Sequence, residues 1–357
     1  MQKRIHIFPL IALAISALLS ALWAGLVRMG WPLPALNTNL AMQHGPLMVS
    51  GFLGTLVILE RAVALGQKWM FASPLLTGLG WMALLVFPGQ LPGAILLTLG
   101  SLVGVLILLV IVRRETKILT VTILIGTLTW FISNLMWTLG QPIFQIVFWW
   151  QAFLVLTIAG ERLELNRVLR PTRLAISLFV AAGTIYLAGV IISTFVLDWG
   201  TRLAGLGMLA LAFWFLRHDI ALRNIHHPWA LTRYIAWCLT LGFVWLAVGG
   251  LFSLTFGAMY AGPFYDAALH AVFVGFVISM IFGHAPIIFP AILGVPIFFQ
   301  RSFYIQLVFL HVSLVIRIAG DLLGSQIIRQ WGGLLNEVAL LIFLTQTIYS
   351  LRKGGKS

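Results

Sequence analysis

Apolar runs of about 20 residues follow one another along almost the whole chain, and most charged residues fall between them. Of the 357 residues, 61% are hydrophobic and only 9% are charged, a composition typical of a polytopic membrane protein. Inside a bilayer every backbone polar group must be hydrogen-bonded within the protein, so only helices and closed barrels span it. The runs lack the alternating pattern of barrel strands. The sequence therefore predicts an all-α bundle of membrane helices.

Polar, proline-rich and glycine-rich breaks divide the chain into about twelve transmembrane helices. We expect these helices to form a single integral membrane domain over residues 1–357. The third and eighth runs are the shortest. The expected spans are Ile5–Val27, His44–Leu65, Phe71–Phe87, Leu91–Val112, Ile118–Leu139, Ile143–Gly160, Leu174–Leu197, Leu203–Leu216, Leu231–Phe256, Ala267–Phe289, Phe303–Ile318 and Gly333–Leu351.

The basic residues indicate the orientation of the helices. With the amino terminus inside, 18 of the 22 Lys and Arg residues fall on the inner side, and only Arg28, Arg202, Arg317 and Arg329 fall outside. The positive-inside rule produces this split, so both termini are predicted to be cytoplasmic. The formal net charge of +13 is then explained by topology. We expect a lipid bilayer as the partner of this surface, and no nucleic acid.

Two histidines, His44 and His270, each stand at the start of a long apolar run. An ionisable side chain within a membrane span is costly and points to a functional site. The predicted topology runs the second and tenth spans in the same direction, which places both histidines near the outer face at about the same depth. Imidazole is a common ligand of haem iron and of copper. We therefore predict that His44 and His270 are ligands of one cofactor.

Residues near these histidines extend the predicted cofactor site. His44, Met48 and Gly51 recur at α-helical spacing, and a stripe with a small residue lets a neighbouring helix or a flat ligand approach closely. At the outer end of the eleventh span, Arg317 and Asp321 are four residues apart on one helical face. They could pair with each other, or Arg317 could hold an anionic group such as a haem propionate. Met48, Gly51 and Arg317 are therefore predicted to bind the cofactor.

Two further histidines are candidate metal ligands at other depths. His284 lies fourteen residues after His270, which is about 21 Å along a helix and too far to bind the same iron. It belongs to an inner layer with Glu60 and Arg61, where a quinone headgroup, a proton relay or a helix cap would each fit. His311 lies about two turns before Arg317, where a second cofactor is a hypothesis.

The segments His44-Gly-Pro-Leu-Met-Val-Ser-Gly-Phe-Leu-Gly-Thr and Leu269-His-Ala-Val-Phe-Val-Gly-Phe-Val-Ile-Ser-Met-Ile-Phe-Gly-His284 resemble the histidine-bearing helices of the NnrS family. The resemblance implies a twelve-helix protein of a bacterial or archaeal inner membrane. It also implies bound haem and copper and a link to nitric oxide stress or denitrification. Family members tend to carry an acidic residue after the first histidine, where this chain has Gly45. They also tend to carry Thr-Gly-Arg after the Gly-His pair, where this chain has Ala285-Pro286.

A broader resemblance is to subunit I of the haem-copper oxidases, which also has twelve helices and histidines on its second and tenth spans. The copper histidines of that subunit lie on its sixth and seventh spans. The corresponding spans of this chain, Ile143–Gly160 and Leu174–Leu197, contain no histidine. The resemblance therefore does not extend to oxygen or nitric oxide reduction at a binuclear centre.

Two functions from different classes follow. The first is a haem-binding membrane protein that carries electrons, senses nitric oxide or protects against it, with a quinone or another redox partner and possible binding of copper. The alternative is a twelve-helix secondary transporter without a cofactor, in which Glu60, His284 and His311 would be coupling or substrate residues. Motifs for ATP hydrolysis, dinucleotide binding and zinc proteolysis are absent from the sequence.

Overall fold

The chain is helical throughout the part that a computed structural model describes. That part comprises residues 7–34, 39–87, 89–295 and 297–354, and it contains no β-strand. Twelve of its helical segments are long and apolar enough to cross a membrane. The predicted all-α class and the twelve spans are therefore confirmed, and the chain is a multi-pass membrane protein. Ile5, the predicted start of the first span, lies outside the described residues.

The spans agree with the predicted ones to within a few residues at most ends. The third and eighth, which looked shortest in the sequence, extend over Lys68–Val86 and Leu197–His218. The elements in chain order are α1 (Phe8–Arg28), α2 (Leu40–Pro46), η2 (Leu47–Gly54), α3 (Thr55–Leu65), η3 (Lys68–Phe71), α4 (Ala72–Val86), α5 (Leu91–Arg114), α6 (Ile118–Thr138), α7 (Ile143–Leu165), η4 (Asn166–Leu169), α8 (Arg173–Ser193), α9 (Leu197–His218), α10 (Ala221–Asn224), α11 (Ala230–Phe256), α12 (Pro263–His270), η5 (Ala271–Ile278), α13 (Ser279–Leu293), α14 (Phe303–Leu322) and α15 (Gln326–Gly354).

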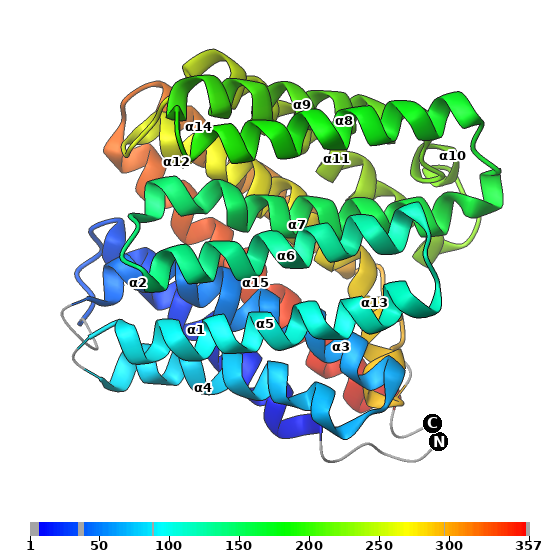
Figure 1. Cartoon of the computed structure of the whole chain (residues 1–357), viewed down its shortest axis with the longest axis horizontal. Coiled ribbons are helices and arrows are strands. Elements are labelled where there is room, and N and C mark those ends of the chain that lie inside the picture. The colour runs from blue at the N-terminus through cyan, green and yellow to red at the C-terminus, as the bar shows by residue number, and fades with distance from the viewer. Residues whose placement is uncertain (1–6, 35–38, 88, 296, 355–357) are drawn as a thin grey trace. The chain divides into compact units, whose positions relative to one another are not determined.

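The chain divides into two compact units near Gly160, within the one membrane domain that the sequence predicts. The first unit holds α1 to α6, most of α7 and the short stretch Ile292–Gly294. In it, α4 packs against α5, α5 packs against α6, and α1 lies against α2 and η2 (Figure 1). In the second unit, α8 and α9 form one antiparallel pair and α14 and α15 form another. There α11 packs on α9 and η5, and α12 packs on α14.

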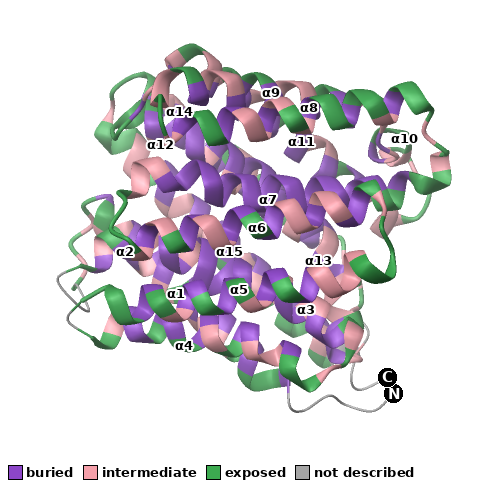
Figure 2. Ribbon diagram, in the orientation of Figure 1, coloured by how far each residue is buried: buried purple, intermediate pink, exposed green. Residues whose placement is uncertain are grey.

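Burial follows the helix faces within each unit, and many outward positions are large and apolar (Figure 2). Leu99 and Leu106 on α5 are exposed, as are Val308, Val312 and Val315 on α14. In water such faces would favour association, but in a bilayer they contact lipid tails, which are as apolar as they are. The exposed apolar faces therefore agree with a membrane location.

A buried ion pair joins the end of α7 to the segment that follows α9. The guanidinium of Arg162 donates two hydrogen bonds to the carboxylate of Asp219, from Nε to Oδ2 at 2.9 Å and from Nη2 to Oδ1 at 2.6 Å. Asn166 Nδ2 also donates to Asp219 Oδ2, and its Oδ1 accepts from the backbone N–H of Ile220. Arg162 is one of the 18 basic residues on the predicted inner side, which indicate the orientation of the helices. The structure gives it a second role, because its side chain is only 3% exposed.

Close packing between α8 and α9 depends on glycine. A methyl group added at Gly189 of α8 would overlap the backbone of Ala204 on α9. One added at Gly183 of the same helix would meet no atom within 4 Å. Small residues that let helix backbones approach closely are a common means of association in membranes.

We expect Gly189→Ala to lower the free energy of unfolding by about 1–3 kcal/mol, because the two backbones must separate. Gly183→Ala is the matched control, and it is expected to be neutral or stabilising by up to about 1 kcal/mol, because alanine favours the helix. Unfolding in mixed detergent micelles measures both. Equal effects of the two substitutions would contradict the packing explanation.

Candidate functional site

The last residue of α12, His270, is held by the residue one turn before it. Its Nδ1 lies 2.9 Å from the backbone carbonyl oxygen of Asp266 and 3.2 Å from Asp266 Oδ1. Both oxygens are acceptors, so Nδ1 carries the hydrogen and Nε2 carries the lone pair of the neutral ring. Histidines that ligate metals almost always donate their other ring N–H to a carbonyl or carboxylate in this way. The structure therefore gives His270 the tautomer that a metal ligand needs.

Asp266 is itself fixed by Arg317 of α14. Arg317 donates from Nε to Asp266 Oδ2 at 2.8 Å and from Nη2 to Asp266 Oδ1 at 2.9 Å. This bidentate pairing fixes the carboxylate plane as well as its position. Arg317 is 8% exposed. The sequence offered Asp321 or an anionic ligand as its partner, and the structure gives Asp266 instead.

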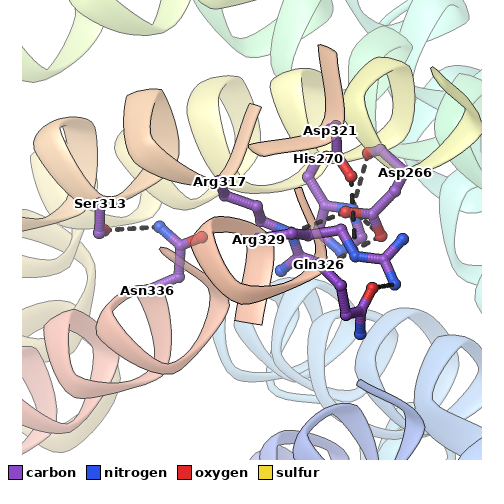
Figure 3. Close-up of polar contacts among 8 residues, drawn as sticks. All are labelled: Asp266, His270, Ser313, Arg317, Asp321, Gln326, Arg329 and Asn336. Carbon is purple, nitrogen blue, oxygen red and sulfur yellow. Dashed lines mark hydrogen bonds and ion pairs between the residues drawn. The ribbon is translucent and has the colours of Figure 1, made fainter. Parts of the chain in front are cut away.

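Other ionisable groups surround this pair in the second unit (Figure 3). The side chain of Asp321 is fully buried, and its Oδ1 lies 3.8 Å from Nε of Arg329 on α15. Glu337, also on α15, is half-buried and close enough to Arg317 to interact with its charge. A methyl group added at Gly332 would overlap the backbone of Arg317, so α15 passes directly against α14 here. The three helices α12, α14 and α15 thus enclose a group of opposite charges.

A small apolar layer lies beside the charges. Ala267 and Ala271 pack with Leu314 and Ile318, and Val274 of η5 packs against them. Because apolar neighbours lower the local dielectric, they strengthen the pairing of the charges beside them. They also fix the distance between α12 and α14, on which the contact between Asp266 and Arg317 depends.

His44 of α2 shows the same ring arrangement in the first unit. Its Nδ1 lies 2.8 Å from the backbone carbonyl oxygen of Ala21 on α1. By the same argument the hydrogen is on Nδ1 and the lone pair is on Nε2. The preceding residue, Gln43, is 4% exposed and donates from Nε2 to the carbonyl oxygen of Leu84 on α4. The start of the second span is therefore held to both α1 and α4.

Each of these histidines lies within three residues of the start of a π-helix, in which hydrogen bonds join residues i and i+5. The π-helix η2 begins three residues after His44, and η5 begins immediately after His270; each is eight residues long. Such segments are rare and occur frequently at functional sites. Met48 and Gly51 lie within η2, so their spacing from His44 is not that of the regular α-helix that the sequence predicts.

Side chains of neighbouring helices occupy the space beside Gly51. A methyl group there would lie 3.0 Å from Trp81 Cβ on α4 and 3.3 Å from Ala17 Cβ on α1. Of the two roles that the sequence gave this glycine, the structure supports helix packing. Met48 is half-buried, and its predicted contact with a cofactor stays a prediction.

A buried hydrogen-bond network closes around η2 in the first unit. Ser50 donates to Asn134 Oδ1 at 2.8 Å and accepts from Trp130 Nε1 at 2.9 Å. Trp150 Nε1 also donates to Asn134 Oδ1, at 3.0 Å. All four side chains are buried, and they come from η2, α6 and α7. Buried polar networks of this kind fix one arrangement of the helices that carry them.

His311 of α14 uses both of its ring nitrogens within the bundle. Its Nδ1 accepts from Trp245 Nε1 at 2.9 Å, and its Nε2 lies 3.3 Å from Ser279 Oγ. The single hydroxyl hydrogen of Ser279 is directed to the carbonyl oxygen of Cys238, so Oγ accepts from Nε2 of the ring. This leaves no lone pair for a metal. The prediction that His311 is a metal ligand is not supported by this geometry.

His284, Glu60 and Arg61 are the residues that the sequence predicts for an inner layer. Nδ1 of His284 lies 2.7 Å from the carbonyl oxygen of Met280, one turn before it, so Nε2 again carries the lone pair. Glu60 and Arg61 are half-buried neighbours whose charged atoms are 4.0 Å apart. Among the described residues, no group of three or more His, Cys, Asp or Glu side chains gathers as a metal site. A role for His284 as a metal ligand stays a prediction.

Asp266 is the functional residue that the sequence reasoning did not single out. The signal was present, because an aspartate one helical turn before a histidine in an apolar segment can reach its ring. Glu337 was also missed, since it lies on the last span with no polar residue of opposite charge at helical spacing.

Residues 7–352 match the model of a family described as a domain of unknown function, DUF8744. The chain belongs to this family. No curated protein matches the chain. The description of the DUF8744 family assigns no activity, so what this chain does must be argued from its own residues.

Proposed function

We propose that this DUF8744 protein binds haem in the membrane, and that His44 and His270 would hold its iron through Nε2. The observation that carries the proposal is the carboxylate–imidazole pair Asp266–His270, with Arg317 behind it. An outer partner that fixes the tautomer and orientation of a histidine is a regular companion of metal ligation. His44 has the corresponding carbonyl partner in Ala21.

The two histidines fit the donor set of a low-spin haem, for which two neutral imidazoles are suitable ligands. When bound, haem would supply one-electron transfer or binding of nitric oxide. Arg317 fits less well as a partner of a propionate, because two of its donors already hold Asp266. Binding of copper stays a prediction, with His284 as the remaining candidate.

The family resemblance of the two histidine segments gives the proposal its biological setting. It supports a role of NnrS type in nitric oxide stress or denitrification, in the inner membrane of a bacterium or archaeon. Electron transfer or sensing is the proposed task, with a quinone or a membrane redox protein as the source of electrons. His284, which is half-buried, is a candidate contact for a quinone headgroup.

The absorbance spectrum of the purified full-length protein tests the proposal. We expect a Soret band, α and β bands on reduction, and at least one haem per chain by the pyridine haemochrome assay. Addition of haem to protein made without it should restore the bands. A colourless protein that does not take up added haem would overturn the proposal.

A secondary transporter remains the second candidate, and the cluster around Arg317 is the observation that favours it. Two aspartates and two arginines lie within the membrane-spanning helices α12, α14 and α15 (Figure 3), and they are Asp266, Asp321, Arg317 and Arg329. Glu337 lies on α15 as well. Ionisable groups at such positions commonly mark substrate or ion pathways. In that case the purified protein would contain no chromophore, and substitution of Asp266 would abolish uptake in proteoliposomes.

A further inference from the structure

We infer that Asp266 sets the reduction potential of the haem bound by His270, and that Arg317 moderates this effect. The inference rests on the proposed function. Its structural basis is a chain of three groups within the second unit: the imidazole of His270, the carboxylate of Asp266 and the guanidinium of Arg317.

The direction of the effect follows from the charge of Asp266. Oδ1 of Asp266 lies 3.2 Å from Nδ1 of His270, so its negative charge favours positive charge on the ring and makes Nε2 a stronger donor to iron. A stronger donor stabilises the ferric state more than the ferrous state, so the potential falls. The hydrogen bond of Nδ1 itself goes to the carbonyl oxygen of Asp266, which carries no net charge and has a smaller effect.

Arg317 acts in the opposite direction. Its two hydrogen bonds engage both oxygens of Asp266, which leaves less negative charge to act on the imidazole. Because Arg317 is buried between α14 and α15, its guanidinium is held in place and screened little by solvent. Loss of Arg317 is therefore expected to strengthen the effect of Asp266 on iron.

The two proposed ligands differ in this respect. Nδ1 of His44 bonds to the neutral backbone carbonyl of Ala21, whereas Nδ1 of His270 faces a carboxylate. The fold thus gives His270, in the second unit, a side-chain neighbour that a substitution can change. A substitution at Asp266 should alter iron through His270 while leaving the contact between His44 and Ala21 unchanged.

A redox titration of the haem-loaded full-length protein, followed by absorbance, tests the inference. We expect Asp266→Asn to shift the potential upward and Arg317→Gln to shift it downward. Asp321→Asn is the matched control, because it changes the carboxyl that hydrogen-bonds to Asp266 while leaving Asp266 itself beside His270. Its upward shift should be smaller than that of Asp266→Asn.

Several outcomes would overturn the inference. Shifts of the same sign for Asp266→Asn and Arg317→Gln would indicate a purely structural role. Equal shifts for Asp266→Asn and Asp321→Asn would show that only charge through space matters. If Asp266→Asn does not accumulate, Arg317→Lys tests the same point, because lysine keeps the charge but loses the bidentate contact. It should shift the potential downward, and an unchanged or raised value would count against the inference.

Failure of this inference is distinguishable from failure of the proposed function. Wild-type protein that binds no haem overturns both. Protein that binds haem through His270, but whose potential is the same in all four variants, overturns only the role of Asp266 and Arg317.

Discussion

The single substitutions His270→Ala and His44→Ala are each expected to remove most of the haem that the purified protein carries. Loss of an outer partner of a metal ligand typically costs about 10–100-fold in affinity, and loss of the ligand itself costs at least as much. Both substitutions leave a small cavity at a half-buried position, so the helices around them should persist. Haem per chain, measured on protein of equal helical content, reports the effect.

The control for these substitutions is His226→Ala, which alters an exposed histidine in the segment before α11. It should keep the full complement of haem. His311→Ala is a second comparison, because it removes a half-buried histidine whose two ring nitrogens are already hydrogen-bonded. Haem that is retained in His44→Ala and His270→Ala, or lost equally in His226→Ala, would refute the assignment of the ligands.

The spectra of the two single variants also report whether they act on one iron. If His44 and His270 bind the same iron, the small fraction of haem that each variant still carries should have a high-spin spectrum, since each substitution removes one of two ligands. If each binds a separate haem, each substitution should remove about half of the chromophore. The first result is the one that the proposed function requires.

The substitution Asp219→Ala is expected to lower the free energy of unfolding by about 3–5 kcal/mol. It leaves the guanidinium of Arg162 buried without its carboxylate, and an uncompensated buried charge carries a cost of that size. The side chains of Arg162 and Asp219 are 3% and 0% exposed, so solvent cannot replace the lost contact. Unfolding in mixed detergent micelles, followed by circular dichroism, measures the change.

The double variant Arg162→Met, Asp219→Leu distinguishes the buried charge from lost packing. It removes both charges and should recover much of the stability that Asp219→Ala loses, because apolar pairs often replace buried ion pairs without net cost. Glu115→Ala is the matched control, since its pair with Lys117 is largely exposed, and it should cost less than about 1 kcal/mol. A double variant no more stable than Asp219→Ala would contradict this account.

The spans could be predicted because lipid imposes one rule on every segment of the chain. A run of about 20 apolar residues has to be a helix wherever it lies, so composition alone located all twelve. The same rule could not predict that two of the spans contain the π-helices η2 and η5. Whether a helix widens depends on the packing of its neighbours, such as Trp81 against Gly51 or Trp245 against Gly275, which no local pattern encodes.

The candidate site was only partly predictable, for a related reason. His44 and His270 stood out because an imidazole at the start of an apolar run is costly and therefore conspicuous. Arg317 was also conspicuous, but its partner was assigned by spacing along one helix, and spacing pointed to Asp321. The actual partner, Asp266, lies 51 residues away in sequence on another helix.

By itself the sequence determined that this chain spans a membrane twelve times and which of its few polar residues are exceptional, because the cost of polar groups in lipid acts on each residue separately. Only the tertiary structure decided which groups satisfy one another. In it His270 contacts Asp266, which Arg317 holds in place. Both ring nitrogens of His311 are hydrogen-bonded, one to Trp245 and one to Ser279. Arg162 is buried against Asp219. The physical reason is that hydrogen bonds and ion pairs reach only about 3 Å, so their partners are set by which helices pack together.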